Sequence, residues 1–231
     1  MELSNRLAAV AALVTEGYAV ADIGTDHGYI PIYLAQTGKN RNMIAMDVND
    51  GPLKRAGDHI AAYGLGQAIT IRKSDGFQNL EPGEVEGVIL AGMGGSLVIK
   101  IMTDYPEVTE SIHEFILQPQ SDLAKVRIFL QKQDYVITAE DMVLEDGKFY
   151  PMMRVEHGKD VPYDEAELRY GRILIRDKHP VLRRFLVKEI QHKERILGEL
   201  SEQESRLAVK RRVELEYEAE IGRRALERMS I

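Results

Sequence analysis

The sequence predicts an α/β fold followed by an all-helical domain, and three observations lead to this assignment. Between residues 18 and 157, short apolar runs alternate with stretches of helical periodicity, which is typical of a parallel sheet covered on both faces. Glu145-Asp146-Gly147 separates two further strand-like runs and predicts a closing β-hairpin. After about Pro162 no strand pattern remains. We therefore expect one domain at residues 1–160 and a second at residues 161–231.

The chain opens with a predicted amphipathic helix, because apolar residues recur every three or four positions at Leu3, Leu7, Val10 and Val14. Ser4 and Asn5 lie where a side-chain cap is expected, and Gly17 follows the last turn. The apolar run is far shorter than the roughly 20 residues that a membrane-spanning helix needs. Glu2 and Arg6 also make a poor basic region for an export signal.

Seven strands and the helices between them are expected next. Apolar runs predict parallel strands at Tyr18–Ile23, Asn42–Asp47, Ala68–Lys73, Val85–Leu90 and Glu114–Leu117. Helical spacing predicts helices near Ile30–Gln36, Leu53–Tyr63, Leu97–Met102 and Asp122–Gln133. The hairpin strands are expected at Tyr135–Leu144 and Lys148–His157. This order of elements predicts a doubly wound sheet with an antiparallel hairpin at one edge.

The second domain is predicted to be a helical hairpin. A near-heptad stripe is formed by Leu182, Leu186, Ile190, Lys193, Leu197, Leu200, Glu204 and Leu207. Val213, Tyr217 and Ile221 continue the stripe out of phase, so we expect a turn near Ser201–Ser205. The two charged members of the stripe predict an imperfect pairing of the helices.

Composition excludes several classes of chemistry. The 231 residues include no cysteine, which excludes disulfides, iron–sulfur clusters and thiol catalysis and fits a reducing, cytoplasmic compartment. The six histidines show neither HxxxH nor HExxH spacing, so no metal is expected. The net charge of −7 is unevenly distributed, because residues 1–158 carry 13 Lys and Arg against 22 Asp and Glu, whereas residues 159–231 carry 17 against 15. The total charge therefore does not argue against an RNA partner.

The first strand ends in a glycine-rich turn, Asp22-Ile23-Gly24-Thr25-Asp26-His27-Gly28. Ligands of doubly wound sheets bind beyond the carboxyl ends of the strands, and glycines allow the backbone to approach them closely. Asp26 occupies the second glycine position of the dinucleotide fingerprint, where a carboxylate would repel a pyrophosphate. This argues against NAD or FAD and favours a cationic ligand with an ammonium or sulfonium group. The alternative is a plain strand–helix turn.

Three further strand ends carry residues suited to the same site. Asp47, at the end of the second strand, is placed to accept hydrogen bonds from ribose hydroxyls; alternatively it caps the next helix. Ser74-Asp75-Gly76 follows the third strand and could read an adenine amino group or form a simple turn. Gly92-Met93-Gly94-Gly95 follows the fourth, where three glycines indicate a close backbone approach.

Together these strand ends resemble those of class I S-adenosylmethionine-dependent methyltransferases. Asp22-x-Gly24-x-Asp26-x-Gly28 is similar to the D-x-G-x-G-x-G loop of that superfamily, from which Asp26 departs. The resemblance implies a seven-stranded Rossmann-like sheet in the order 3-2-1-4-5-7-6 with a reversed last strand. Four segments together resemble the bacterial tRNA (adenine-22-N1)-methyltransferase family, which carries a C-terminal helical hairpin: Leu3-Ser4-x-Arg6-Leu7, Asp22–Tyr29, Ala91–Gly95 and Gln118-Pro119-Gln120.

The resemblance implies methyl transfer from S-adenosylmethionine to N1 of a tRNA adenine in the D-arm region. We expect the donor to be bound by Asp22, Gly24, Thr25, Asp26, His27, Gly28, Asp47, Val48, Ser74, Asp75, Gly76, Ala91 and Gly92. Expected substrate contacts near the site are Arg6, Tyr29, Met93, Gly94, Gly95, Gln118, Pro119 and Gln120. Candidate catalytic residues are Asp22, Asp26, His27, Tyr29 and Met93, and the proton acceptor among the first three stays open.

The fourth strand end also indicates which nitrogen would be methylated. Enzymes that methylate exocyclic amines commonly carry a D/N-P-P-Y/F motif here, and Gly92-Met93-Gly94-Gly95 offers no such acceptor. A ring nitrogen such as adenine N1 has an in-plane lone pair, so positioning alone can support its reaction. The alternatives are methyl transfer to another RNA or a small molecule, or a non-catalytic donor-binding scaffold.

Basic residues of the tail are candidates for holding the RNA backbone: Arg183, Arg184, Lys188, Lys210, Arg211 and Arg212. The alternative is that these side chains belong to solvated helix faces. We expect tRNA as the partner, no membrane association, and a monomer or weak homodimer.

Overall fold

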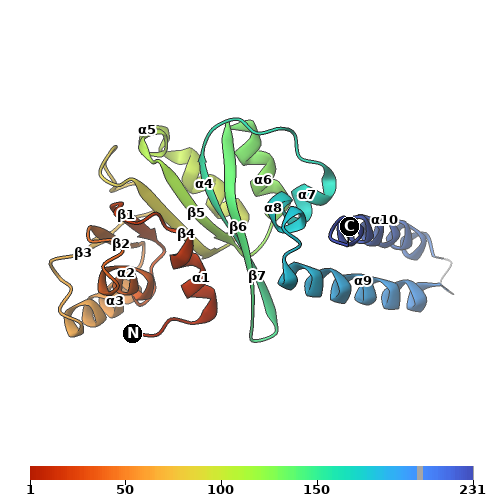
Figure 1. The fold of residues 1–231 in the computed structure, drawn as a ribbon, viewed down its shortest axis with the longest axis horizontal. Coiled ribbons are helices and arrows are strands. Elements are labelled where there is room, and N and C mark those ends of the chain that lie inside the picture. The colour runs from red at the N-terminus through yellow and green to blue at the C-terminus, as the bar shows by residue number, and fades with distance from the viewer. Residues whose placement is uncertain (202–204, 231) are drawn as a thin grey trace. The chain divides into compact units, whose positions relative to one another are not determined.

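The computed structural model describes residues 1–201 and 205–230, which divide into two compact units, Met1–Asp160 and Val161–Ile231. The first unit contains a seven-stranded sheet in the order β3-β2-β1-β4-β5-β7-β6 (Figure 1). Its strands are β1 (Val20–Ile23), β2 (Met43–Asp47), β3 (Ile69–Lys73), β4 (Gly87–Met93), β5 (Glu114–Pro119), β6 (Tyr135–Glu145) and β7 (Lys148–His157). This order confirms the fold that the sequence predicts.

The central strands are parallel and buried. β1 pairs in parallel with β2 and β4, whereas β7 runs antiparallel to both β5 and β6. Every residue of β1 and β5 is buried, the polar Asp22, Glu114 and Gln118 included, so burial along these strands is continuous rather than alternating. The strand order reverses between β1 and β4, and right-handed crossovers then place the helices before and after this point on opposite faces. Such a reversal leaves a crevice where ligands bind.

Six helices belong to the first unit within the described residues: α1 (Asn5–Leu13), α2 (Tyr29–Gln36), α3 (Asp50–Ala62), α4 (Gly95–Asp104), α5 (Pro106–Ser111) and α6 (Leu123–Lys132). α1 contacts α2, whereas α4 contacts α5 and α6. The Ser4 side chain accepts a hydrogen bond from the Leu7 N–H at 3.4 Å, as expected for the cap of α1. The sequence did not predict α5, because six residues are too few to show a helical period.

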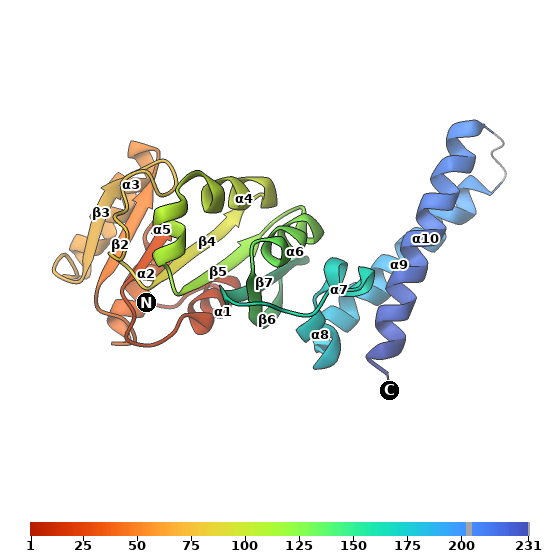
Figure 2. The ribbon, with the colours of Figure 1, turned by 90° about the horizontal axis from the view of Figure 1, so that it is seen from above.

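The second unit is helical throughout its regular structure, with α7 (Glu165–Tyr170), α8 (Arg172–Arg176), α9 (Pro180–Leu200) and α10 (Arg206–Arg228). α9 and α10 pack side by side as a hairpin (Figure 2). Residues 202–204 are not described, so Glu204 and the middle of the predicted turn at Ser201–Ser205 lie outside the described residues. No helix within residues 1–201 and 205–230 combines the length and the apolar character needed to cross a membrane.

The predicted stripe is correct for α9 and wrong for much of α10. Leu182, Leu186, Ile190 and Lys193 are buried, as expected. Leu207, Val213 and Tyr217 are instead exposed by 81%, 62% and 58%. The buried face of α10 consists mainly of small residues, among them Ala208, Ala219, Gly222 and Ala225. A Cβ on Gly222 would lie 3.2 Å from Ile190, so close helix packing rather than large apolar side chains selects this face.

Lys193, which interrupts the stripe, is accommodated by ion pairs. Its Nζ lies 3.0 Å from the Glu189 carboxylate and 3.4 Å from that of Glu218. A lysine can be buried when its charge is compensated in this way. At the position where Lys193 interrupts the apolar stripe, an ion-pair cluster therefore joins α9 and α10.

Candidate active site

A cavity of about 340 Å³ opens at the carboxyl ends of β1 and β4, where the strand order reverses. Its lining combines the first strand end with the start of α1 and the ends of β4 and β5: Arg6, Leu7, Asp22, Gly24, Thr25, Asp26, His27, Tyr29, Ile30, Ala91, Gly92 and Gln120. Most of these residues were predicted from sequence to form the site. The fold therefore brings the first and fourth strand ends together, as expected for this sheet.

Backbone hydrogen bonds fix the ends of β1, β2 and β3 against one another. The N–H groups of Gly24 and Thr25 both donate to the Met46 carbonyl, at 2.8 and 2.9 Å. The Ser74 N–H donates to the Asp47 carbonyl at 3.0 Å. The three predicted donor-binding segments thus form one hydrogen-bonded edge. Gly24 and Gly28 take φ values of +78° and +68°, which glycine adopts without strain.

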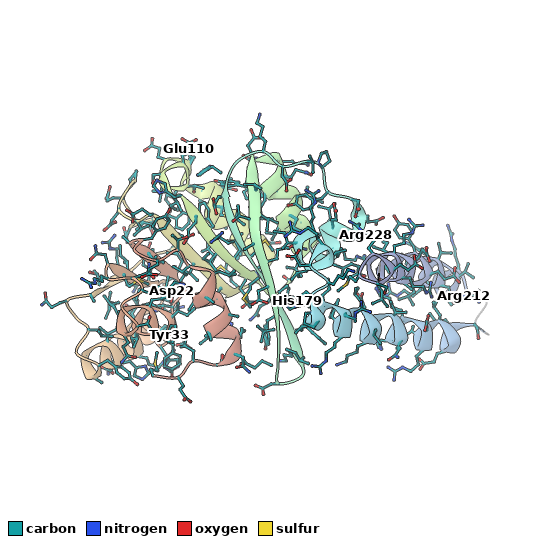
Figure 3. All side chains as sticks on the ribbon, in the orientation of Figure 1. Asp22, Tyr33, Glu110, His179, Arg212 and Arg228 are labelled. Atoms are coloured by element: carbon teal, nitrogen blue, oxygen red, sulfur yellow. The ribbon has the colours of Figure 1, made fainter. Side chains whose placement is uncertain are left out.

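Asp22 and Asp47 form the acidic part of this edge. Asp22 is buried in the first unit (labelled in Figure 3), and burial, together with the nearby charge of Asp47, raises the pKa of its carboxyl to about 6. The Asp47 carboxylate accepts a hydrogen bond from the Asn49 N–H at 2.7 Å and is partly exposed. The pair therefore presents negative potential beside the cavity, which suits a cationic ligand.

Asp26 lies in the predicted place but has a charged partner that the sequence reading missed. Arg55, on α3, donates from Nε and Nη2 to the Asp26 carboxylate at 3.1 and 2.5 Å. His27 Nε2 lies 3.5 Å from the same carboxylate. Asp26 is therefore not a free anion, so the case for a cationic ligand depends on Asp22 and Asp47.

The residues after β2 and β3 shape the neighbouring turns. The buried Ser74 hydroxyl donates to the Gly76 carbonyl at 2.9 Å and accepts from the Asn79 N–H at 3.1 Å. Asp75 and Val48 are exposed, so both can be reached by a ligand that extends from the cavity across β2 and β3. Ser74 therefore holds the turn that presents Asp75.

The fourth strand end contains a bulge at Gly92. Ala91 pairs with Gln118 and Met93 with Pro119, so Gly92, with φ of +80°, is left out of the ladder. The Gln120 N–H donates to the Met93 carbonyl at 2.9 Å. The bulge therefore turns the Gly92 backbone away from β5 at a point where it lines the cavity.

Gly94 and Gly95 both lie close to Ser121. A Cβ on Gly95 would lie 2.5 Å from the Ser121 carbonyl oxygen, and one on Gly94 would lie 3.3 Å from the Ser121 hydroxyl. Neither glycine lines the cavity. Gly95 is therefore required for packing of α4 against the loop before α6, and the substrate contacts expected of the two glycines stay predictions.

Arg6 joins the site from α1. Its Nη1 donates to the Gln118 side-chain oxygen at 3.0 Å, and its guanidinium lies 5.4 Å from the centre of the Tyr150 ring. Gln118 is fully buried, and its Nε2 makes no hydrogen bond within the described structure. Arg6 is thus fixed at the cavity rather than extended as a free surface cation, which places its charge close to any acceptor.

Three rings gather at the cavity mouth: His27, Tyr29 and His59 of α3. Their centroids are 5.0 to 5.5 Å apart and their planes are within 19° of parallel. Sequence reasoning missed His59 and Arg55 because it considered strand ends only. The signal that could have found them is their four-residue spacing on the helix that follows Asp47.

The six basic tail residues do not form one cluster. Arg183 of α9 donates to the Met229 carbonyl at 2.5 Å, near the end of α10, whereas Arg212 donates to the Ser201 carbonyl at 2.9 Å, at the other end of the hairpin. Figure 3 labels Arg212 and Arg228 near opposite ends of α10. Lys210 and Arg211 both lie near Glu214, at 3.9 and 3.2 Å, while Arg184 and Lys188 are exposed on α9.

The site residues also bear on metal binding. Within residues 1–201 and 205–230, no group of three or more His, Cys, Asp or Glu side chains is arranged to hold a metal ion. The cavity is instead lined by backbone, two carboxylates, a histidine and an arginine.

Comparison with known proteins adds to this geometry. Residues 3–153 match the family model of a methyltransferase domain. The tRNA (adenine(22)-N(1))-methyltransferase of Bacillus subtilis (strain 168) is 32% identical over 207 residues, which cover 87% of either chain. The structure of Streptococcus pneumoniae Sp1610 in complex with S-adenosyl-L-methionine superposes with a TM-score of 0.87 at 30% identity, covering 97% of this chain and 100% of the other. The M. capricolum TrmK complex with S-adenosyl-homocysteine gives a TM-score of 0.85 at 27% identity, covering 99% and 100%. The sequence motifs, the strand order and these relatives together place the chain in the tRNA (adenine(22)-N(1))-methyltransferase family.

Proposed function

We propose that this protein transfers a methyl group from S-adenosylmethionine to N1 of adenine 22 in tRNA. The observation that carries the proposal is the cavity at the reversal of strand order, lined by Asp22, His27 and Gly92, in a chain of this family. We further infer that the protein acts in the cytoplasm as a monomer or a weak homodimer.

The donor fits the groups present at the strand ends. Asp47 is placed to accept hydrogen bonds from ribose hydroxyls, as acids at this position of doubly wound sheets do. The buried Nδ1 of His27 makes no hydrogen bond within the described structure and can bind the donor's carboxylate. Asp22 attracts the donor's ammonium and sulfonium charges. Bound there, S-adenosylmethionine would supply an electrophilic methyl group.

The chain's task on the acceptor side is to position an adenine ring. N1 of adenine attacks through its own in-plane lone pair, so alignment contributes more than proton removal. Since the bulge takes Gly92 out of the ladder with β5, its carbonyl and that of Ala91 are candidates to accept the N6 protons. Tyr29, which lines the cavity, and Met93 are candidates to support the ring. Because Asp26 is paired with Arg55, Asp22 and His27 are the better candidates for a proton acceptor.

Adenine N1 is hidden by base pairing, so the target must be unpaired or flipped out of its helix. Arg6, which is fixed beside the cavity by Gln118, is placed to contact a phosphate of that nucleotide. The tail cations on α9 and α10 are candidates for a second grip on the RNA backbone.

The test is incubation of the protein with labelled S-adenosylmethionine and an unmodified tRNA transcript, followed by nucleoside analysis. We expect labelled 1-methyladenosine, and we expect none with a matched transcript that carries guanine at nucleotide 22. Label in another nucleoside, or label that persists in the guanine transcript, would refute the assignment. Methylation of small molecules but not of tRNA would favour the alternative acceptor class.

A further inference from the structure

α3 places two side chains against the loop that binds the donor. Arg55 and His59 are one helical turn apart and so lie on the same face of the helix. Arg55 contacts the Asp26 carboxylate, and His59 Nδ1 lies 3.1 Å from the carbonyl oxygen of His27. Two consecutive residues of the loop are therefore held by one helix.

The same contact arranges the aromatic rings at the cavity mouth. The His27 and Tyr29 planes differ by 8° and their centroids are 5.0 Å apart. His59 lies 5.3 Å from the first ring and 5.5 Å from the second, at 19° and 12° to their planes. We call these three residues the ring cluster. Each ring contacts the other two, so each helps to hold the orientation of the others.

The ring cluster is partly open to solvent, although burial of aromatic rings is generally favourable. Tyr29 is 38% exposed, and His27 and His59 are partly exposed. Parallel rings that stay exposed beside a cavity offer the surface on which unpaired bases stack. Arg55 compensates the Asp26 charge next to the cluster, which weakens the repulsion between this carboxylate and the phosphates of an approaching RNA.

We propose that His59 is a positioning residue that keeps Tyr29 and His27 aligned as a stacking surface for an unpaired base of the substrate tRNA. The proposal rests on the proposed function and deepens it, because it assigns to α3 a part in RNA recognition. His59 acts through the ring cluster and does not touch the reacting atoms.

The test separates recognition of tRNA from binding of the donor. For His59→Ala we expect KM for unmodified tRNA to rise about fivefold or more, the low end of the cost of losing base–aromatic stacking, while kcat changes less than twofold. Arg55 still holds the loop through Asp26 in this variant. The dissociation constant for S-adenosylmethionine, from isothermal titration, should therefore stay within twofold, which also confirms folding. His59→Phe keeps an aromatic ring, so its KM for tRNA should return close to the wild-type value.

Tyr63→Ala is the matched control, because it removes another exposed aromatic one turn further along the chain, outside the ring cluster. It should leave all three constants unchanged. A wild-type KM in His59→Ala, or a raised KM that His59→Phe does not reverse, would overturn the inference. If wild-type protein itself forms no 1-methyladenosine, the proposed function fails instead.

A direct readout is available if His59→Ala fails to fold. The chain contains no tryptophan, so Tyr29→Trp introduces a single fluorescent reporter into the ring cluster. We expect unmodified tRNA to quench this fluorescence, and His59→Phe in the same background to retain the quench. Fluorescence that tRNA leaves unchanged would overturn the inference.

Discussion

We predict that Asp22 makes donor binding depend on pH. Burial raises the pKa of its carboxyl from 3.8 to about 6, so near neutral pH the side chain is an anion that lacks the full solvation of water. A cation bound in the cavity replaces some of that solvation and stabilises the charged form. Asp22 is thus predisposed to bind a positively charged ligand rather than a phosphate.

A pH-dependent affinity for S-adenosylmethionine follows from this shift. Below pH about 6 the unliganded carboxyl holds a proton that must leave when the cation binds. The affinity should therefore rise about tenfold between pH 5 and pH 7.5. Isothermal titration at the two pH values measures the change. Asp22→Asn should bind more weakly and with a flatter dependence, and a wild-type affinity that is independent of pH would contradict this role.

The raised pKa of Asp22 has the opposite effect on the stability of the unliganded protein, which should fall as pH rises. Because the folded state binds the Asp22 proton more tightly than the unfolded state, the favourable contribution of this group is complete below pH about 4. It is lost as pH rises toward about 6. Thermal melts at pH 4.5 and 6.5 check this: the wild-type protein should lose stability relative to Asp22→Asn over that interval. An unchanged difference between the two proteins would show that the carboxyl is not shifted.

Asp47 can be tested against a nearby acid of the same charge. Asp47→Ala removes the carboxylate at the end of β2 and should weaken S-adenosylmethionine binding at least tenfold, about 1.4 kcal/mol, because a hydroxyl–carboxylate hydrogen bond is lost. Asp50→Ala removes an exposed carboxylate that pairs with Lys73 and should leave the affinity within twofold. Equal effects of the two substitutions would indicate a general loss of negative potential instead of a specific contact.

At the scale of elements, strands could be predicted from the sequence better than the face of a helix. Buried parallel strands are rich in consecutive apolar residues, which is why β1, β2 and β5 were located to within two residues at each end. In α10 only Ile221 of the predicted stripe is buried, because most of the buried side consists of Ala and Gly, which carry little hydrophobic signal. The buried face of α10 is set by how closely α10 packs against α9. This distance depends on both helices, so the apolar period of one helix cannot predict it.

The start of α4 illustrates the same limit, since its glycines were assigned to a ligand but Gly95 serves packing. Gly95→Ala should destabilise the protein by about 1–3 kcal/mol, because the new Cβ meets the Ser121 backbone, which cannot move as a side chain can. Gly94→Ala should have a smaller effect, since its Cβ meets only the Ser121 hydroxyl at 3.3 Å. Chemical denaturation measures both. A Gly94→Ala protein less stable than Gly95→Ala would contradict the packing role.

For the molecule as a whole, the sequence predicted the sheet order and the convergence of the strand ends. It could not show that Arg55 neutralises Asp26 or that Arg6 is held by Gln118, because these contacts join elements far apart in the chain. Nor could it show that the tail cations fall at two ends of a hairpin. The charge division between an acidic first unit and a near-neutral tail is why we predict that the second unit contacts RNA.

Salt dependence of tRNA binding tests that division. Arg184 and Lys210 are exposed cations of α9 and α10; the first makes no ion pair with any described residue, and the second has only a long pair with Glu214, at 3.9 Å. If both contact phosphates, the double substitution to Gln should reduce the slope of log affinity against log salt by about 1.4–1.8, since each contact contributes about 0.7–0.9. Fluorescence anisotropy with labelled tRNA between 50 and 200 mM salt, roughly the range over which such slopes are resolved, provides the measurement.

The matched control replaces Arg223 and Arg224, which pair with Glu194 and Glu220, and so removes equal charge from the same unit. Because those guanidinium groups are already compensated, their loss should leave the slope nearly unchanged. Equal slopes for the two double variants would mean that the RNA senses only net charge, and the tail would then have no defined phosphate contacts.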